Sequence, residues 1–396
     1  MHIAGGMTAL NLLRTVRVGL AGDPKHVLSY VERDEARAYA PAGGVDVPCD
    51  MTGSPLREGN SWFDDTFDEV GFPLESVRVT QRIPALYKDI LGGWDEDNPL
   101  ELCTFSERAW QKRKTTRIHV LDRRLPANAL VMLERGLYVA SPELVCAQLA
   151  QRLSAPQLAL VIMELTGSWS LRPPGAPSGL GVTCYGLPPA TTLERIVALA
   201  GRIHYLRGRK RLMQALDTAL PNSASRPEAF VALMMSQPVE NGGYGLGTPL
   251  LNPRIEVPDH AKGHVTQDAY YPDIYFQDHY VDLEYDSVEY HFDPQTIIAS
   301  AIASGADTQD PNLFRMAYAN KLIDDRRRAR DLGALGVHVI PVTSKDIASV
   351  TALDHVAWAF ACHLHRAEGF DIDAFENALS RPTNRTARIR LFNELA

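Results

Sequence analysis

The chain has 396 residues, a length that is enough for two or three domains. Of these residues 45% are hydrophobic and 22% are charged, so the domains can have ordinary cores. Its formal net charge of −8 at pH 7 excludes a protein that binds nucleic acid through an overall positive potential, so any DNA contact requires local basic patches. The five cysteines are scattered without a Cys-x-x-Cys pair, which excludes a zinc finger and indicates reduced thiols. No apolar run suits a transmembrane helix or a signal peptide, so we expect a cytoplasmic protein without a membrane partner.

The first 153 residues are predicted to form a β-containing domain with a regulatory or recognition role. Short helices are expected at 9–16 and 26–31, and the acidic, Gly- and Pro-rich stretch 41–98 is typical of a solvated surface. Four short β-forming runs and a closing helix follow, at 101–105, 116–121, 129–133, 137–140 and 142–153. The basic run 112–117 is typical of a phosphate contact or of a solvated loop.

One segment of this domain has the sequence Gly-Leu-Tyr-Val-Ala-Ser-Pro-Glu-Leu-Val-Cys-Ala-Gln-Leu-Ala, at 136–150. It resembles the segment that ends the regulatory domain of AbiEi-type antitoxins. In those proteins a winged-helix module precedes a β-rich domain, and no helix-turn-helix pattern precedes the segment here. The resemblance implies a toxin or defence-system partner, whereas the missing module argues against regulation of a promoter.

Residues 154–222 are predicted to be a helical connector. Loop signals such as Pro173-Pro-Gly-Ala-Pro177 dominate 167–189, and a helical region is expected from Thr192 to Leu220. This region contains a basic run that we predict to contact nucleic acid: Arg207, Arg209, Lys210 and Arg211. An exposed helix face that balances nearby acids explains the same charges.

The stretch 271–291 has the pattern of a β-hairpin with an acidic face. Its strands are expected at 274–276 and 280–285, with a polar turn at 277–279. Alternation along the second strand places Asp282, Glu284 and Asp286 on one face. Asp273 at the start of the first strand can face the same side. We therefore predict that Asp273 and Glu284 converge on one hard cation, Mg²⁺ or Mn²⁺.

Short motifs in a fixed order surround this hairpin. The hairpin itself holds Pro272-Asp273, Glu284-Tyr-Asp286 and His291. The upstream motifs are Ser225-x-x-Glu228, Gly242-Gly-Tyr-Gly245, Pro249 and Asn252, and the downstream motifs are Asp325-x-x-Arg328, Leu332, Gly336, Val339-Ile-Pro-Val-Thr343 and Ile347. Together, over about residues 223–349, they resemble the very-short-patch-repair-like endonucleases of the PD-(D/E)XK superfamily. The resemblance implies an α+β chain whose third domain, 223–396, is a restriction-endonuclease-like αβββαβ mixed sheet.

The same resemblance implies metal-dependent hydrolysis of phosphodiester bonds in DNA, with Asp273 and Glu284 as the metal ligands. Asp286 stands at the position of the superfamily's usual lysine, where a carboxylate suits a further ligand or a base for the attacking water. His291 is predicted to be a general base or a phosphate contact, and a structural role is the alternative. Such an enzyme would act in repair, in phage defence or in a mobile element.

Two further candidates have a functional and a structural interpretation. Glu228 is a candidate active-site acid, and it also fits a capping box with Ser225. Arg328 is a candidate for fixing a phosphate or orienting the acids, and it can also pair with Asp325 along its helix. Arg326, in the same helix, is predicted to contact nucleic acid.

The rest of the third domain is predicted to be mainly helical. Beyond the hairpin, helices are expected at 296–303, 312–332, 352–360 and 372–379, with a buried strand at 337–342. His338 in that strand is interpreted as a packing residue. The basic tail 381–390 is interpreted as a DNA contact or as a solvated end.

The competing interpretation is a catalytically inactive DNA-binding or antitoxin-like regulator that keeps the nuclease fold. The missing lysine and the negative net charge favour it, whereas the set of unpaired acids argues against it. An RNA-directed nuclease is a third interpretation. The nuclease requires the carboxylates of Asp273 and Glu284 to approach within about 5 Å of each other. A basic side chain seated permanently between them would favour the regulator.

Overall fold

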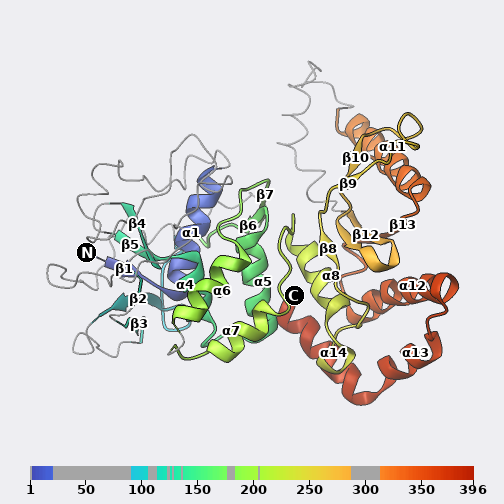
Figure 1. The fold of residues 1–396 in the computed structure, drawn as a ribbon. Coiled ribbons are helices and arrows are strands. Elements are labelled where there is room, and N and C mark those ends of the chain that lie inside the picture. Colours follow the sequence, from blue (N-terminus) through green and yellow to red (C-terminus); the bar gives the residue numbers. More distant parts are fainter. Residues whose placement is uncertain are drawn as a thin grey trace. The chain divides into compact units, whose positions relative to one another are not determined.

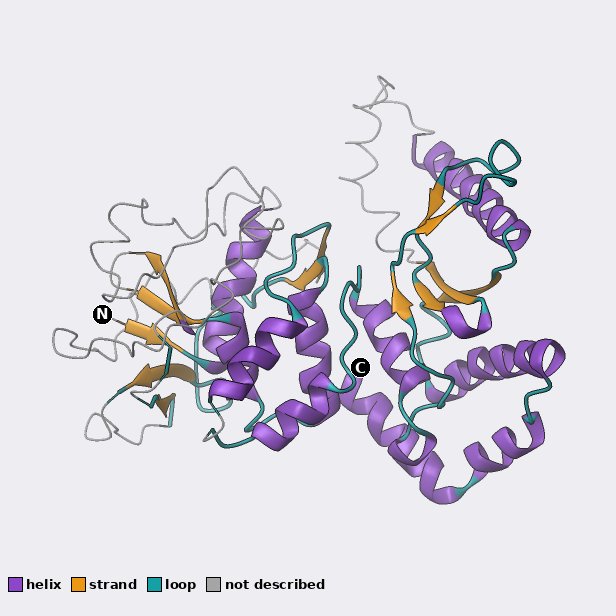
Figure 2. Ribbon diagram, viewed as in Figure 1, coloured by secondary structure: helices purple, strands orange, loops and turns teal. Residues whose placement is uncertain are grey.

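The computed structural model describes residues 2–20, 91–105, 114–122, 125–126, 129–134, 137–175, 183–203, 206–286 and 313–396. The chain forms two compact units, Met1–Arg226 and Pro227–Ala396, and each contains helices and β-sheet (Figure 1 and Figure 2). The predicted α+β class is therefore confirmed. The residues predicted as a connector, 154–222, lie within the first unit. The helices predicted at 26–31 and 296–303 fall outside the described residues.

A five-stranded mixed sheet forms one layer of the first unit. In spatial order its strands are β3 (Thr116–Val120), β2 (Leu100–Thr104), β1 (His2–Ala4), β5 (Leu137–Ala140) and β4 (Leu130–Glu134). The β1–β5 and β2–β3 pairs are parallel, and the β1–β2 and β4–β5 pairs are antiparallel. The four predicted strands are confirmed with shifts of about one residue. Strand β1 lies outside the predictions because three residues hold too little periodic signal.

The described helices of the first unit form the other layer. They are α1 (Gly6–Leu20), α4 (Pro142–Leu149), α5 (Ala155–Thr166), α6 (Leu193–Arg202) and α7 (Arg209–Leu216). Helices α1 and α4 contact the sheet, and α5, α6 and α7 pack on α4. The helix predicted from Thr192 to Leu220 is interrupted at Gly208, whose φ of +90° is left-handed and suits glycine.

A short hairpin interrupts the stretch that the sequence predicts to be a loop. It pairs β6 (Trp169–Leu171) with β7 (Thr183–Tyr185) in antiparallel fashion. The prediction is wrong here because tertiary burial outweighs the local Pro and Gly signals. Trp169 is 1% exposed, and its indole N–H donates to Ser223 Oγ at 2.8 Å.

Two arginines in the apolar helix α1 are structural. Arg14 makes a two-pronged contact with the buried Glu164 of α5, with N···O distances of 2.6 and 2.8 Å. Arg17 donates to the carbonyl oxygens of Glu164, Gly167 and Pro188 at 2.9 to 3.0 Å. A buried charge is tolerated when it is paired and hydrogen-bonded, so these contacts explain why the apolar helix includes charges.

The second unit is built on a four-stranded sheet with the order β13–β12–β11–β8. Along the chain its elements include α8 (Arg226–Ser236), β8 (Leu250–Leu251), β11 (Ile274–Phe276), β12 (Val281–Asp286), α11 (Leu313–Ala334) and β13 (His338–Thr343). The β8–β11 and β11–β12 pairs are antiparallel, and β12–β13 is parallel. A small hairpin, β9 (Ile255–Glu256) with β10 (Ala269–Tyr270), lies between β8 and β11 in sequence. The predicted β11–β12 hairpin is confirmed, with a 3-10 turn at Gln277–His279.

The two faces of this sheet pack against different helices. On one face, Phe276 contacts Phe360 of α12 (Val350–Glu368) edge-on, with ring centroids 4.7 Å apart. His338, predicted to be a packing residue, stacks on His363 of the same helix with centroids 4.0 Å apart. On the other face, Tyr275 belongs to an apolar cluster with Leu332 of α11. Helix α11 therefore lies over the face opposite to the one that α12 covers.

Two helices, α13 (Ile372–Ser380) and α14 (Pro382–Leu395), end the unit. The basic tail that the sequence predicts as a DNA contact or a solvated end forms much of α14. Its Arg388 is only 4% exposed, lies over the ring of Tyr244, and has its Nε 2.9 Å from Asp354 Oδ1. Tyr244 donates its hydroxyl proton to the same oxygen at 2.8 Å. Arg388 thus anchors α14 and is not part of a solvated end.

Candidate active site

Three carboxylates gather on the α11-facing side of the second sheet. Asp282 and Glu284 alternate along β12, and Asp273 directly precedes β11, the antiparallel neighbour of β12. Backbone groups hold these carboxylates across the hairpin. The Tyr285 N–H donates to Asp273 Oδ2 at 2.9 Å, and the Ile274 N–H donates to Asp282 Oδ1 at 3.3 Å. The strand pairing itself therefore positions two of the three acids.

Glu228 joins these acids from α8 through Asn252. Glu228 is 6% exposed, and its Oε2 accepts a hydrogen bond from Asn252 Nδ2 at 3.0 Å. The Asn252 backbone N–H donates to the carbonyl oxygen of Asp273 at 3.1 Å. Asn252 has a left-handed φ of 48°, which asparagine adopts more readily than most residues. We refer to Asp273, Asp282, Glu284 and Glu228 as the acidic cluster.

Arg328 of α11 reaches into the acidic cluster. Its Nη2 lies 3.1 Å from Glu284 Oε2 and 4.0 Å from Asp273 Oδ1, and it donates to the carbonyl oxygen of Tyr271. Asp273 and Glu284 therefore face one common point, as a shared cation requires. A guanidinium already stands at that point, and this is the arrangement that favours the regulator over the nuclease.

Burial raises the pKa values of the three hairpin acids. The pKa of Glu284 rises to about 9, through burial first and then through the charge of Asp282. The pKa of Asp282 rises to about 7, again through burial first and then through the charge of Asp273. Burial, and then the charges of Glu284 and Glu228, raise the pKa of Asp273 well above its ordinary value. Arg328 acts in the opposite direction on all three, so its single charge does not balance the cluster.

The donor chemistry of the acidic cluster fits a hard cation. Asp282 Oδ2 is buried and accepts no hydrogen bond within the described part of the chain, and the partner of the buried Glu284 Oε2 is the ion pair with Arg328. A buried carboxylate oxygen without a donor is costly unless a proton or a cation neutralises it. Among the described residues, no set of three or more His, Cys, Asp and Glu side chains is arranged to hold a metal ion. Mg²⁺ commonly uses only one or two carboxylates, with waters and substrate phosphates as its other ligands.

The other predicted site residues are the following. Asp286 ends β12 and is exposed, and Arg326 is exposed on α11. His291 lies outside the described residues. The basic run of the predicted connector is in the first unit, at the start of α7. The hairpin thus unites Asp273 and Glu284, and tertiary packing adds Glu228 and Arg328.

Asp282 and Asn252 are cluster residues that the sequence does not single out as site residues. Asp282 shares the strand alternation of Glu284, and this signal places it on the same face. Its complete burial, at 0% exposure, is decided by the packing of α11 and β13 around β12. Asn252 gives a weaker signal, because an isolated asparagine is more often a turn residue than a partner of a buried acid.

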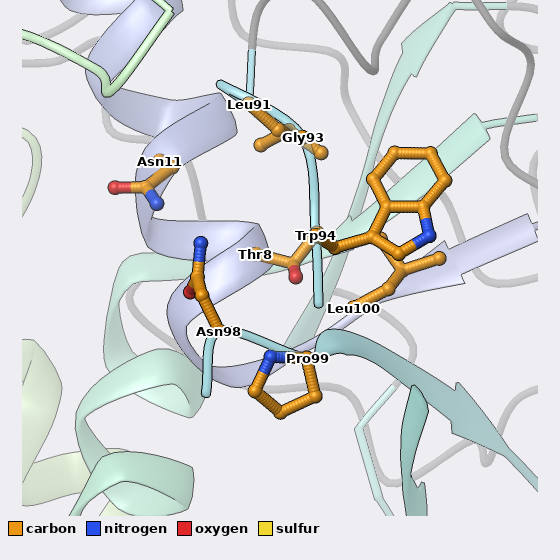
Figure 3. Close-up of a pocket in the computed structure, with 8 residues that line it drawn as sticks. All are labelled: Thr8, Asn11, Leu91, Gly93, Trp94, Asn98, Pro99 and Leu100. Carbon is orange, nitrogen blue, oxygen red and sulfur yellow. The ribbon is translucent and has the colours of Figure 1, made fainter. Parts of the chain in front are cut away.

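A small pocket occurs elsewhere, in the first unit, and none of the predicted site residues lines it. Figure 3 shows Thr8 and Asn11 of α1 on one side and Trp94, Asn98 and Pro99 on the other. Its free volume accommodates about one water molecule. The pocket therefore does not suggest a substrate site.

None of the described helices combines the length and apolar character that a membrane crossing requires. Comparison with family models, with curated proteins and with solved structures finds no match to this chain. The acidic cluster itself is therefore the basis for a function.

Proposed function

We propose that the second unit is a metal-dependent endonuclease that hydrolyses phosphodiester bonds in DNA, with Mg²⁺ or Mn²⁺ bound by Asp273 and Glu284. The observation that supports it most is the convergence of these two partly buried carboxylates on one point, with pKa values raised despite the nearby arginine. An acid cluster with this surplus of negative charge is stabilised by an added cation. Such strongly perturbed acids are also enriched at functional sites.

The order of elements around the cluster supports the same proposal. Apart from the small β9–β10 hairpin, the described elements α8, β8, β11, β12, α11 and β13 have the order of the αβββαβ arrangement of the restriction-endonuclease-like fold. The last strand is parallel to β12, so it requires a crossover through α11. This crossover brings Arg328 to the carboxylates.

Each residue has a distinct task in the proposed reaction. Asp273 and Glu284 hold the ion, which when bound supplies Lewis-acid stabilisation of the phosphoryl group and of the leaving oxygen. Arg328 donates to a phosphate oxygen once it leaves Glu284, and so provides the positive charge that a lysine supplies in the usual motif. Asp286, at the exposed end of β12, accepts a proton from the attacking water. Asn252 holds the backbone carbonyl of Asp273 through its own N–H. Its side chain holds the carboxylate of Glu228 beside Asp273.

A second candidate function is a DNA-binding or antitoxin-like regulator without catalytic activity. The observation that favours it is the contact of Arg328 Nη2 with Glu284 at 3.1 Å, which fills the position of the proposed ion. The carboxylate of Asp286 in place of a lysine points in the same direction. On this interpretation the arginine is a permanent partner of the acids and the ion never binds.

A cleavage assay separates the two. Supercoiled plasmid and labelled DNA and RNA oligonucleotides are incubated with the full chain and Mg²⁺ or Mn²⁺. We expect DNA nicking that requires the ion and falls at least about 100-fold in Asp273→Asn and in Glu284→Gln. The matched control is Asp259→Asn, because the Asp259 side chain is 95% exposed and pairs only with Lys262 among the described residues.

The outcomes distinguish all three interpretations. Binding of DNA without cleavage in either ion would establish the regulator. Cleavage of RNA alone would keep the mechanism and change the substrate. Equal loss of activity in the Asp259→Asn control would show that the assay reports general damage.

A further inference from the structure

The first unit contains a buried carboxylate that gathers three basic side chains. Glu101 of β2 is 1% exposed, and His119 Nε2 lies 2.6 Å from its Oε2. Its Oε1 is paired with Arg152, which follows α4, and lies 3.6 Å from Arg117 Nη1 on the edge strand β3. The two guanidinium groups thus meet at one oxygen although they repel each other.

Positive charge is in surplus at this point. The two arginine side chains are 42% and 39% exposed, so they cover Glu101 and still present donors to solvent. The start of helix α1 adds to the positive potential, because a side chain at Gly6 would collide with Glu101. Burial acts to raise the pKa of Glu101, yet His119, Arg152 and Arg117 bring it below its ordinary value. One carboxylate therefore does not neutralise its basic partners.

The basic run at the start of α7 lies against the same place. A Cβ atom at Gly208 would come within 2.8 Å of the Ala150 backbone, so the turn before α7 packs directly on the turn after α4. Arg211 Nη1 donates to the Ala150 carbonyl oxygen at 3.1 Å. Arg152 is two residues farther along the chain. The turn that leads to Arg152 therefore packs on the turn that carries Arg207, and Arg207 and Lys210 are exposed beside it.

We propose that Arg117, Arg152, Arg207 and Lys210 form one phosphate-binding surface on the first unit, which contacts the backbone of duplex nucleic acid. We refer to these four residues as the basic patch. It combines residues from three stretches of sequence: Arg207 and Lys210 belong to a run predicted to contact nucleic acid, Arg117 ends the basic run 112–117, and Arg152 lies outside both runs.

Nucleic acid fits this surface better than a single small anion. The basic patch includes the start of β3, the turn after α4 and the start of α7 with the turn before it, so it presents several separate donors. Phosphates repeat along a nucleic acid backbone, and guanidinium groups bind them in a two-pronged fashion. In a chain with a net charge of −8, such a local surplus supplies the attraction that the whole molecule lacks.

The test is equilibrium binding of a fluorescently labelled DNA duplex, measured by anisotropy at several salt concentrations in EDTA. We expect wild type to bind with a clear salt dependence. Arg207→Gln/Lys210→Gln and Arg117→Gln/Arg152→Gln should each weaken binding at least about fivefold and reduce the salt slope by about 1 to 2. The first pair is the safer variant, since neither side chain has a hydrogen bond or an ion pair in the described structure.

The matched control is Lys262→Gln/Arg366→Gln, which removes the same charge from exposed positions of the second unit and should change the affinity less than twofold. Equal affinity of wild type and both patch variants, equal weakening in the control, or no duplex binding by wild type would overturn the proposal. It depends on the proposed function only for the choice of DNA as ligand. Asp273→Asn separates the two: it should lose activity in the cleavage assay and keep the wild-type affinity in this binding assay, because it leaves the basic patch intact.

Discussion

The two units contain charge clusters of opposite composition, and the difference indicates what each one lacks. In the first unit a single buried carboxylate, Glu101, faces three basic side chains. In the second unit one arginine, Arg328, contacts the partly buried Asp273 and Glu284, and the buried Asp282 and Glu228 complete the acidic cluster. Glu101 has its pKa lowered by its partners, whereas the acids around Arg328 have theirs raised. The first cluster is suited to an added anion and the second to an added cation.

The largest expected effect comes from removing the single base of the acidic cluster. If Arg328 contacts phosphate in the reaction, Arg328→Ala should lower the cleavage rate about 100-fold or more in saturating Mg²⁺. Arg327→Ala is the matched control, because Arg327 is 58% exposed and pairs only with the exposed Asp324 among the described residues. Unchanged or increased cleavage in Arg328→Ala would mean that the arginine only competes with the ion.

The matching change in the first unit removes the single acid. Glu101→Gln leaves two guanidinium groups and His119 around a neutral side chain, and breaking a buried ion pair costs about 3 kcal/mol. We expect a fall of that size in the free energy of unfolding, measured by urea titration followed by circular dichroism. Glu96→Gln is the control and should cost less than about 0.5 kcal/mol, because its ion pair with Lys114 is exposed. Equal effects would contradict a special role for Glu101.

The two clusters should respond to pH with opposite signs. The folded pKa of Glu284, about 9, lies above its unfolded value, so the native state binds more protons between about pH 5 and pH 9. In EDTA its contribution to stability is therefore present at low pH and lost as pH rises, by at most about 1.4 kcal/mol per unit. The pKa of Glu101 is lowered, so its contribution is lost as pH falls below the ordinary glutamate range.

Urea titrations of wild type, Glu284→Gln and Glu101→Gln across this range separate the two contributions. Mg²⁺ should reduce the alkaline loss of stability in wild type, because a cation favours the ionised carboxylates. Glu284→Gln should show less of this loss, and Mg²⁺ should no longer change it. If stability falls equally with alkaline pH in wild type and in Glu284→Gln, the raised pKa of Glu284 is not the cause of that fall, and the predicted opposite response of the two clusters is wrong.

The smallest expected effect concerns the link between Glu228 and the hairpin. Asn252→Gly keeps the left-handed backbone but removes the donor to Glu228, and should cost about 1 kcal/mol. Asn252→Ala also strains the backbone, so we expect about 1 kcal/mol more. Thermal unfolding of the two variants gives the difference directly. Equal midpoints would mean that the backbone conformation at Asn252 does not matter.

Local pattern accounts for much of the fold. The strands from 100 to 140 were predictable from short runs of β-forming residues, and the β11–β12 hairpin from a period of two, because both signals are local properties. The same alternation placed Asp282 and Glu284 on one face. It did not reveal the β6–β7 hairpin, because only the burial of Trp169 explains a strand in a Pro- and Gly-rich stretch. Nor did it distinguish the anchored Arg388 from a solvated tail.

The partners of the charged residues depended on tertiary structure. By itself the sequence determined the mixed α+β class, the acidic face of the hairpin and the existence of separate basic runs. Only the fold decided that Arg328 contacts Asp273 and Glu284, and that Arg117 and Arg152 share Glu101. The physical reason is that the alternation of side chains along a strand depends only on neighbouring residues. The interaction between two charges depends on their distance in space, which the packing of helices on sheets decides.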